Sequence, residues 1–485
     1  MKEKTIVIGA GFGGLASAAL LAKKGHDVVL LEKNSQPGGR ARRLEQDGFT
    51  FDMGPSWYLM PSIFDEYFSH FDAKPGDYYT LERLDPGYKM FFHDGEVSMP
   101  ADKDEIYKLF DSLEENGAQK LKNYLKDAEY KYKTSIDSVL YESYDSILDM
   151  FSWKLLKKGI GLDIFSSMDR HVSKHFSSDR AKKVLQYTQV FLGGAPNNTP
   201  AVYSLMSYVD LVQGVWYPRG GMYSVVKALE KLCEENGVSI RYDTPARGIR
   251  ITEGVPTGVD TDYGVMTAQN IVVNADYHHA ETKLLPKRYQ TYPASWWKKK
   301  TMAPSAFLIY LGLDEEVPEL EHHSLFLQKD WTNHFEDIFD EPSWPKEPSY
   351  YVCCPSKTDD EVAPEGKENL FILVPIPSGI EDTTAIRKYY RDKILSHMAG
   401  ELDYPVRKHI ETEKVFTLKD FNKDYNAYKG TALGLAHTVF QSAAFRPKQK
   451  SSKVKNLYYV GQYTHPGIGV PMTLISAENV VNIIE

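Results

Sequence analysis

Two kinds of apolar pattern alternate at the start of the chain. Residues 5–8 form a mainly apolar run, which is typical of a strand buried in a parallel sheet. Leucine and alanine then recur at helical spacing over residues 15–22, and a second apolar run covers residues 27–31. Strand, helix and strand in this order predict a βαβ unit.

The same signals return later, separated by segments of another kind. Buried strands are expected at 239–242 and 271–276, a helix at 223–236, and a strand, glycine-rich turn and helix at the C-terminal end. Between them, residues 75–100 predict short strands, 102–190 predict helices, and 285–450 alternate strands and helices between proline-rich loops. Elements of one α/β unit are therefore expected at the start, middle and end of the chain.

This order predicts an α/β fold with a discontinuous first domain. A Rossmann-like domain would comprise residues 1–75, 215–285 and 455–485. A mixed α+β domain, inserted as residues 76–214 and 286–454, would bind substrate. Its helical part would face a membrane.

The turn after the first strand carries the sequence G-x-G-x-x-G. Gly9, Gly11 and Gly14 let the backbone turn tightly and line a pyrophosphate, and the N-terminus of the following helix attracts phosphate charge. Glu32 ends the second strand, where its carboxylate can accept hydrogen bonds from an adenosine ribose. The alternative is a signal peptide, but its cleavage would destroy the βαβ unit.

A second glycine turn distinguishes flavin from nicotinamide. It reads Pro37-Gly38-Gly39-Arg40, and a guanidinium fixed there can reach the phosphates from their other side. A nicotinamide dehydrogenase does not need this group. The competing interpretation is a surface turn with an exposed arginine.

Composition narrows the classes of function. The chain has 485 residues, 42% of them hydrophobic, with a mean hydropathy of -0.42 and no apolar run long enough to span a bilayer. A net charge of -9 argues against nucleic acid as a partner. Aromatic residues make up 13% of the chain, which fits either an ordinary core or a pocket for a large apolar ligand.

The cysteines and histidines do not have metal-ligand spacing. The three cysteines, Cys233, Cys353 and Cys354, are typical of a reducing cytoplasm, and the last two would point to opposite faces of a strand. The doublets 278–279 and 322–323 are adjacent histidines without further ligands nearby in the sequence. We therefore expect no metal.

Four segments together resemble the bacterial phytoene desaturase group of carotenoid desaturases, within the flavin amine-oxidase superfamily. They are GAGFGGLASAALLAKKGHDVVLLEKNSQPGGR, FDMGPS, VWYPRGGM and LYYVGQYTHPGIGVPMTLISAENV. The resemblance covers nearly the whole chain. It implies FAD, a long isoprenoid substrate such as phytoene, and desaturation of C–C single bonds toward a carotene such as lycopene.

The resemblance also assigns cofactor contacts beyond the first turn. Gly39 and Arg40 would close over the phosphates, and Ala246 would meet the adenine through its backbone. The flavin ring and its neighbouring chain would contact Gly54, Pro55, Ser56, Gly461, Val470, Pro471 and Met472. Members of the superfamily often carry an acidic residue after the glycine of the last strand, whereas this chain has Gln462. We expect FAD to bind, with altered charge at that point.

Chemistry suggests hydride transfer to flavin N5 followed by proton loss, because a hydrocarbon C–H is a very weak acid. Trp216 and Tyr217 are candidates for an aromatic wall of the reaction site, with ordinary packing under a turn as the alternative. Arg219 is a candidate catalytic residue, and it could instead brace its turn. Asp210 is a candidate base, against the alternative of a solvated or paired carboxylate. His465 is a candidate proton relay, and it could instead fix its own turn.

A hydrocarbon substrate would reside in a bilayer, so the enzyme must reach it there. Trp153–Leu162 and Ala294–Thr301 mix aromatic or apolar residues with lysines and are candidates for peripheral attachment. Solvated basic surfaces are the alternative. The expected location is cytoplasmic, at the inner face of the membrane, with quinone or oxygen as electron acceptor.

Three rival functions remain open at this stage. A related enzyme could act on C30 diapophytoene, on the 3,4 bond of a hydroxycarotenoid, or as a carotenoid oxidase. An amine oxidase would need an aromatic cage for its amine. A flavin-free protein that binds prenyl lipids would share the fold but would not need the GGR turn.

Overall fold

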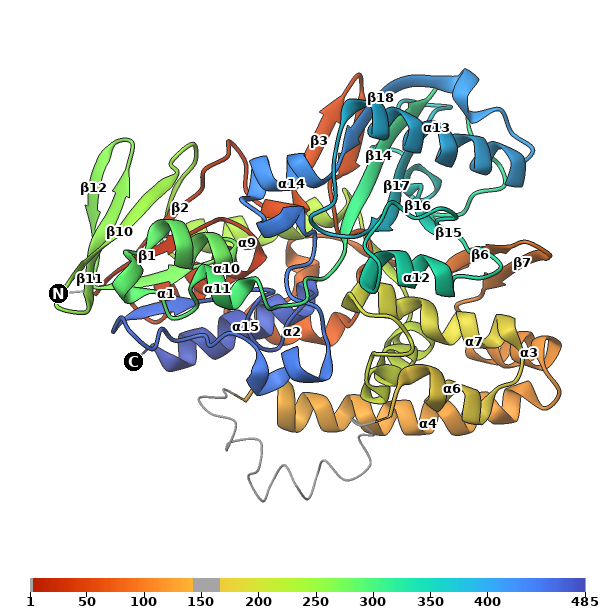
Figure 1. Cartoon of the computed structure of the whole chain (residues 1–485), viewed down its shortest axis with the longest axis horizontal. Helices are drawn as coiled ribbons and strands as arrows, with labels where there is room; N and C mark the ends of the chain where they lie inside the picture. Colours follow the sequence, from red (N-terminus) through yellow and green to blue (C-terminus); the bar gives the residue numbers. More distant parts are fainter. Residues whose placement is uncertain (1–2, 143–165, 485) are drawn as a thin grey trace.

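The computed structural model describes residues 3–142 and 166–484 (Figure 1). Its first sheet is parallel and has five strands in the order β19-β13-β1-β2-β9. The strands are β1 (Lys4–Ile8), β2 (Asp27–Leu31), β9 (Ser239–Arg241), β13 (Asn270–Val273) and β19 (Leu457–Tyr459). One sheet therefore contains strands from the start, middle and end of the chain, as the apolar pattern predicted.

Four helices cover one face of this sheet. They are α1 (Phe12–Lys23), α2 (Pro61–Ser69), α9 (Met222–Glu235) and α15 (Val470–Ile483), and they share one core with the sheet. The buried alanines Ala16, Ala18 and Ala19 of α1 have small side chains, so neighbouring helices can approach it closely. The other face packs against an antiparallel sheet of β10 (Ala246–Thr252), β11 (Val255–Thr261) and β12 (Gly264–Thr267).

A second large sheet has seven strands in the order β18-β14-β17-β16-β15-β6-β7. They are β6 (Tyr88–Phe92), β7 (Gly95–Met99), β14 (Ser305–Leu313), β15 (His323–Phe326), β16 (Tyr350–Cys353), β17 (Glu368–Ile376) and β18 (Ile410–Phe416). Helix α13 (Thr384–Glu401) packs on one face. Cys354 contributes to the core on that face and Cys353 to the core on the other, so the two thiols point apart as predicted.

Helices form a layer below the seven-stranded sheet in Figure 1. They are α3 (Lys103–Leu113), α4 (Gly117–Ser135), α6 (Met168–His175) and α7 (Asp179–Gln186). Within the described residues, no helix is both long enough and apolar enough to cross a bilayer. The candidate membrane segment Trp153–Leu162 lies outside the described residues.

Shorter elements connect these layers. Strands β3 (Arg43–Gln46) and β4 (Phe49–Asp52) form one hairpin, and β5 (Leu81–Arg83) pairs with β8 (Trp216–Pro218). The remaining helices used below are α11 (Ala294–Trp297), α12 (Thr332–Phe339) and α14 (Leu418–Tyr425).

The second candidate membrane segment, Ala294–Thr301, is only partly at the surface. Trp297 of α11 is fully buried, and its indole N–H donates to the Tyr292 carbonyl at 2.9 Å. The expectation that this segment presents its tryptophans to a bilayer is therefore wrong for Trp297, which packs in the core against Tyr277 and Tyr463. Trp296 is partly buried, and the Lys300 ammonium lies 4.4 Å from its ring centre.

Candidate functional site: a dinucleotide cradle joined to an apolar cavity

One cavity of about 660 Å³ begins at the carboxyl ends of the parallel strands and continues toward the seven-stranded sheet. Ligands of open α/β sheets bind at this edge. The lining on the first side includes Gly9, Gly11, Glu32, Gly39, Arg40, Gly54, Pro55, Ser56, Ala246, Gly461, Gln462, Val470, Pro471 and Met472. The structure thus brings together every predicted cofactor contact except Gly14, which lies behind the first turn.

The first turn is too tight for any side chain. A Cβ at Gly14 would lie 1.9 Å from the Gly9 carbonyl oxygen, so Gly14 is the point where α1 packs on β1. Gly9 has φ of +99°, and a Cβ there would lie 2.9 Å from the Asn274 carbonyl oxygen. No side chain of the described residues caps the N-terminus of α1, so its backbone N–H groups are open to the cavity.

Glu32 ties the second strand to the first turn. Its carboxylate accepts hydrogen bonds from the backbone N–H groups of Ala10 at 2.8 Å and Asn34 at 2.9 Å. Burial raises the pKa of Glu32, and these hydrogen bonds oppose the rise. Ala246, at the start of β10, lines the cavity with Glu32, and Thr244 just before it donates its N–H to the Glu32 carbonyl at 2.7 Å.

Arg40 projects into the cavity from the second glycine turn. Gly38 and Gly39 have φ of +107° and +57°, the left-handed backbone that glycine adopts without strain. A Cβ at Gly54 would lie 2.3 Å from the Arg40 carbonyl oxygen, so the FDMGPS loop packs directly on this turn. The Arg40 Nε is buried and has no hydrogen-bond partner among the described residues.

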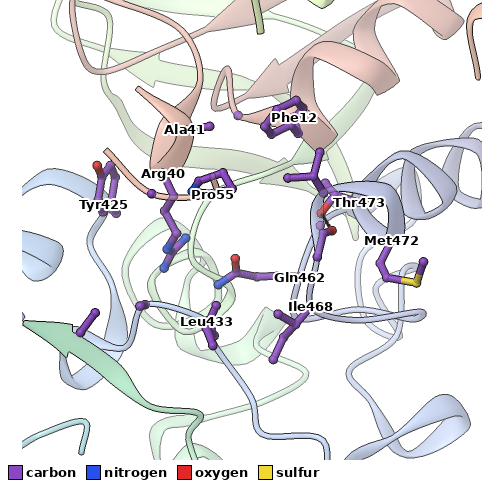
Figure 2. A pocket seen from close by; sticks show the side chains of 18 of the residues that line it. Phe12, Arg40, Ala41, Pro55, Tyr425, Leu433, Gln462, Ile468, Met472 and Thr473 are labelled. Atoms are coloured by element: carbon purple, nitrogen blue, oxygen red, sulfur yellow. Dashed lines mark hydrogen bonds between the residues drawn. The ribbon is translucent and has the colours of Figure 1, made fainter. Parts of the chain in front are cut away.

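The C-terminal turn faces Arg40. Figure 2 shows the Gln462 amide and the Arg40 guanidinium pointing toward each other across the cavity. The Gln462 side-chain nitrogen is buried and also lacks a partner in the described part of the chain. Gly469, with φ of +121°, precedes α15, whose first residues Val470, Pro471 and Met472 line the cavity without a side-chain cap.

Comparison with known proteins settles the family. The model for flavin containing amine oxidoreductases matches residues 12–484. The chain belongs to this family. This chain is 48% identical over 481 residues to the carotenoid 3,4-desaturase of Haloarcula japonica. The alignment covers 98% of this chain and 97% of the relative.

Two further comparisons agree. The flavin oxidoreductase is 36% identical to the zeta-carotene-forming phytoene desaturase of Myxococcus xanthus, over 98% of this chain and 92% of the relative. A solved oxidoreductase from Methanosarcina mazei has a TM-score of 0.63 and 18% identity over 99% of this chain and 100% of that one. The resemblance to carotenoid desaturases is therefore confirmed, and the chain is an FAD-dependent oxidoreductase acting on CH–CH bonds.

The residues present fit FAD. Two uncapped helix N-termini, on α1 and α15, offer backbone N–H groups to negative charge. Arg40 Nε and Gln462 Nε2 are buried donors that lack partners within the described residues, and a bound polar ligand would satisfy them. The glycine turns leave room for a backbone contact that a Cβ would block.

Asn274 was not predicted from the sequence as a residue of the cofactor site. It follows β13, next to β1, and its side chain lies against Gly11, Gly13 and Gly461. Its amide N–H donates to the Gly9 carbonyl at 3.3 Å. The signal in the sequence was a polar residue directly after a buried strand. The carboxyl ends of parallel strands meet at one edge of the sheet, so this residue was bound to lie near the cofactor contacts.

The far side of the cavity is apolar. Its lining includes Leu205, Met206, Ala306, Leu308, Leu325, Leu327, Phe335, Ile338, Leu373 and Leu433. Figure 2 shows Leu433 and Ile468 where this apolar part meets Gln462. The same cavity therefore joins polar cofactor contacts to a surface suited to a hydrocarbon.

Asp210 lies behind Tyr187, a residue of the cavity wall. It is buried, and its Oδ2 accepts hydrogen bonds from the hydroxyls of Tyr88 at 2.9 Å and Tyr187 at 3.0 Å. Burial raises the pKa of Asp210 to about 7, with the two phenols opposing the rise. Tyr187 lines the cavity and Asp210 does not.

The other three candidates do not line the cavity. The ring N–H of His465 donates to the Val139 carbonyl at 2.9 Å, and burial lowers the pKa of His465 to about 4, while the next residue, Pro466, lines the cavity. Trp216 donates its indole N–H to Gln213, and Arg219 forms an exposed ion pair with Glu82 at 2.6 Å. These contacts match the bracing alternatives considered for each residue.

Proposed function

We propose that this protein is an FAD-dependent carotenoid desaturase that removes hydrogen from the 3,4 bond of a carotenoid. The supporting observation is the single cavity that connects the cofactor cradle to an apolar wall. The relative at 48% identity is a carotenoid 3,4-desaturase, whereas the phytoene desaturase of Myxococcus xanthus is 36% identical.

Desaturation of phytoene is the second candidate. Both substrates are long apolar chains, and a methylene or hydroxyl difference changes binding by only about 1–3 kcal/mol in an apolar pocket. The apolar lining supports either chain, and the difference in identity between the two relatives favours the 3,4 bond. C30 chains are a third possibility that the same assay covers.

The protein's part in the reaction is positioning and proton transfer. When bound, FAD supplies the two-electron acceptor for the hydrogen that leaves carbon with its electron pair. Apolar side chains on the far side hold the chain against the cofactor edge and exclude water. Loss of that hydrogen makes the neighbouring C–H acidic, so a weak base suffices for the second step.

Tyr187 is placed to receive this proton. Its phenol oxygen accepts the proton from carbon as its own O–H proton passes to the Asp210 carboxylate, 3.0 Å away. The raised pKa of Asp210, about 7, suits a group that accepts a proton near neutral pH. Asp210 is then the base through Tyr187, and His465, Trp216 and Arg219 hold the surrounding turns.

The division into domains follows from this assignment. Residues 1–75, 215–285 and 455–485 would hold FAD, and residues 76–214 and 286–454 would hold the carotenoid. A substrate dissolved in a bilayer requires the enzyme to attach to the membrane surface. Trp296 provides an aromatic ring suited to the membrane–water interface, and Lys298–Lys300 provide positive charges for anionic headgroups. The expected place is the cytoplasmic face of the membrane, with quinone or oxygen as final electron acceptor.

The test is desaturation in liposomes. Purified protein with FAD and a quinone would receive phytoene, C30 diapophytoene or an acyclic hydroxycarotenoid saturated at the 3,4 bond, and products would be separated by chromatography and identified by absorption. We expect the hydroxycarotenoid to gain one double bond. Turnover of phytoene alone would move the assignment to the second candidate, and a folded protein without flavin absorption would overturn both.

A further inference from the structure

Three side chains with metal-ligating atoms gather behind the cavity wall. They are His322, His323 and Cys353, and one ligand atom from each lies within 4.8 Å of the others. All three residues are at least nine-tenths buried, with exposed fractions of 3%, 0% and 4%. None of them takes part in the reaction proposed above.

Strand pairing assembles this cluster. β15 and β16 are antiparallel, and His323 lies directly opposite Cys353 in their register. Side chains of such a pair project from the same face of the sheet. His322 precedes β15 and its ring centre lies 4.5 Å from that of His323. Sequence spacing argued against a metal because the third ligand comes from another strand.

Each imidazole is held through Nδ1 and leaves Nε2 without a partner. The Nδ1 of His322 is 2.7 Å from the Thr358 hydroxyl, and the Nδ1 of His323 is 2.7 Å from the Tyr351 hydroxyl. Neither Nε2 has a hydrogen-bond partner among the described residues. The His323 ring also stacks on Trp57, with ring centres 4.1 Å apart.

This arrangement matches a metal site more closely than a core polar cluster. Metal-binding histidines usually bind through one nitrogen while the other is oriented by a hydrogen bond. Buried polar atoms without partners are rare in native proteins, and two of them in one buried cluster with a thiol call for an explanation. A single ion would occupy both nitrogens and the sulfur.

We propose that His322, His323 and Cys353 bind one Cu(I) ion in a three-coordinate site. A thiolate is a soft ligand that suits Cu(I), and imidazole is a common copper ligand. Two neutral rings and one thiolate carry a single negative charge, so a monovalent ion leaves the buried site neutral. A divalent ion would leave a net positive charge away from water, which is costly. On binding, the Cys353 thiol releases its proton to solvent and copper keeps its oxidation state.

Two carboxylates act on the cluster, Asp52 on Cys353 and Asp359 on His322, and each has hydrogen-bond donors of its own. Asp52 accepts hydrogen bonds from the backbone N–H groups of Met222 at 2.6 Å and Tyr223 at 3.1 Å. Asp359 lies on the side of Tyr217, whose hydroxyl donates to it at 3.0 Å, and the Gly220 N–H donates at 2.7 Å. The Arg219 guanidinium lies 4.0 Å from it. Its charge is therefore already matched by its own partners.

Hydrogen bonds link the cluster to the cavity wall through Tyr351, whose hydroxyl lies 2.7 Å from the His323 Nδ1. The Tyr351 hydroxyl is 2.8 Å from the Ser56 hydroxyl, and both residues line the cavity. Copper on Nε2 of His323 would leave the proton on Nδ1, which must then donate to Tyr351. Tyr351 would in turn donate to Ser56, so the ion would fix the direction of this chain of hydrogen bonds.

The experiment is anaerobic titration of the full-length flavoprotein with Cu(I) against a chromophoric Cu(I) chelator. We expect one tightly bound equivalent, a rise in thermal midpoint, and an X-ray absorption spectrum with one sulfur and two imidazole nitrogens. Cys353→Ser should weaken binding at least 100-fold. His323→Gln serves as a second variant should the first fail to fold.

Cys354→Ser is the matched control, because this neighbouring buried thiol points into the other core. It should bind copper as the unchanged protein does. Near-ultraviolet circular dichroism of each variant reports correct packing. Equal copper binding by Cys353→Ser and Cys354→Ser, no binding above the chelator by the unchanged protein, or a preference for Zn(II) in a parallel titration would each overturn the proposal.

Discussion

The Tyr187 hydroxyl donates to Asp210 at 3.0 Å while Tyr187 itself lines the cavity. The carboxylate accepts a second hydrogen bond from Tyr88, which does not line that cavity. Asp210 can therefore exchange a proton with a substrate in the cavity through Tyr187. The two tyrosines form a natural comparison, since they share a partner and differ in access.

Tyr187→Phe should slow desaturation about 10²–10⁴-fold, the usual contribution of a positioned acid or base. Asp210→Asn should produce a loss of similar size, because both variants interrupt the same transfer. The measurement is kcat in liposomes, normalised to bound FAD from its visible absorption. Tyr88→Phe is the control and should keep most of the activity. If Tyr88→Phe and Tyr187→Phe lose activity equally, the pair is structural.

The pKa of Asp210 predicts how stability depends on pH. Burial raises this pKa from 3.8 to about 7, so the folded protein holds a proton that the unfolded chain releases above pH 4. Below about pH 4 the carboxyl group is protonated in both the folded and the unfolded protein, so it does not lower the free energy of unfolding. As pH rises toward 7, its ionisation in the unfolded chain lowers the free energy of unfolding by at most about 4 kcal/mol. The free energy of unfolding should therefore fall across this window.

Asp210→Asn removes this titration. The difference in thermal midpoint between the variant and the unchanged protein should move in favour of the variant from pH 5 to pH 8. Differential scanning fluorimetry at several pH values provides the measurement. A difference that stays constant with pH would show that Asp210 is ionised throughout in the folded protein.

Gly14→Ala should abolish FAD retention. The added Cβ would lie 1.9 Å from the Gly9 carbonyl oxygen, a backbone atom, so α1 must move away from the turn. Flavin absorption per protein after gel filtration is the measurement. Gly400→Ala is the matched control: in α13 the added Cβ would meet no other part of the described chain within 4 Å, and the variant should be neutral or gain up to about 1 kcal/mol in stability. Full flavin content in Gly14→Ala would contradict the close packing described above.

The cofactor side of the site was largely predictable because its signals are local. Glycines at fixed spacing specify turns that no other residue tolerates, and an acidic residue at a strand end identifies the ribose position. Four strands of the parallel sheet were recognisable for a similar reason, since each is a short, mainly apolar run next to a turn or helix, while β9 (Ser-Ile-Arg) was recognisable by its position after the end of a helix. Only the order of the strands within the sheet could not be predicted from the sequence.

Contacts between residues far apart in the chain were not predictable, because strands and helices bring these residues together only in the folded protein. Asn274 contacts three glycines from two other segments, and His323 meets Cys353 only through β-sheet register. Trp297 misled for the opposite reason: a Trp-Trp-Lys pattern is typical of a membrane surface, yet tertiary packing buries this ring completely. Composition alone does not separate those outcomes.

The last prediction concerns Gln462, where an acidic residue is common in the superfamily. The Gln462 amide and the Arg40 guanidinium point toward each other across the cofactor side of the cavity (Figure 2). Gln462→Glu adds a negative charge there, and this charge opposes the negative charge that flavin gains on reduction. The two-electron midpoint potential should therefore fall by tens of millivolts, where 30 mV corresponds to about 1.4 kcal/mol. Spectroelectrochemistry of the bound flavin measures this shift, with Gln462→Met as the uncharged control. An unchanged potential in Gln462→Glu would mean that Arg40 neutralises the new carboxylate fully, and a potential that rises would contradict the proposed effect of this charge.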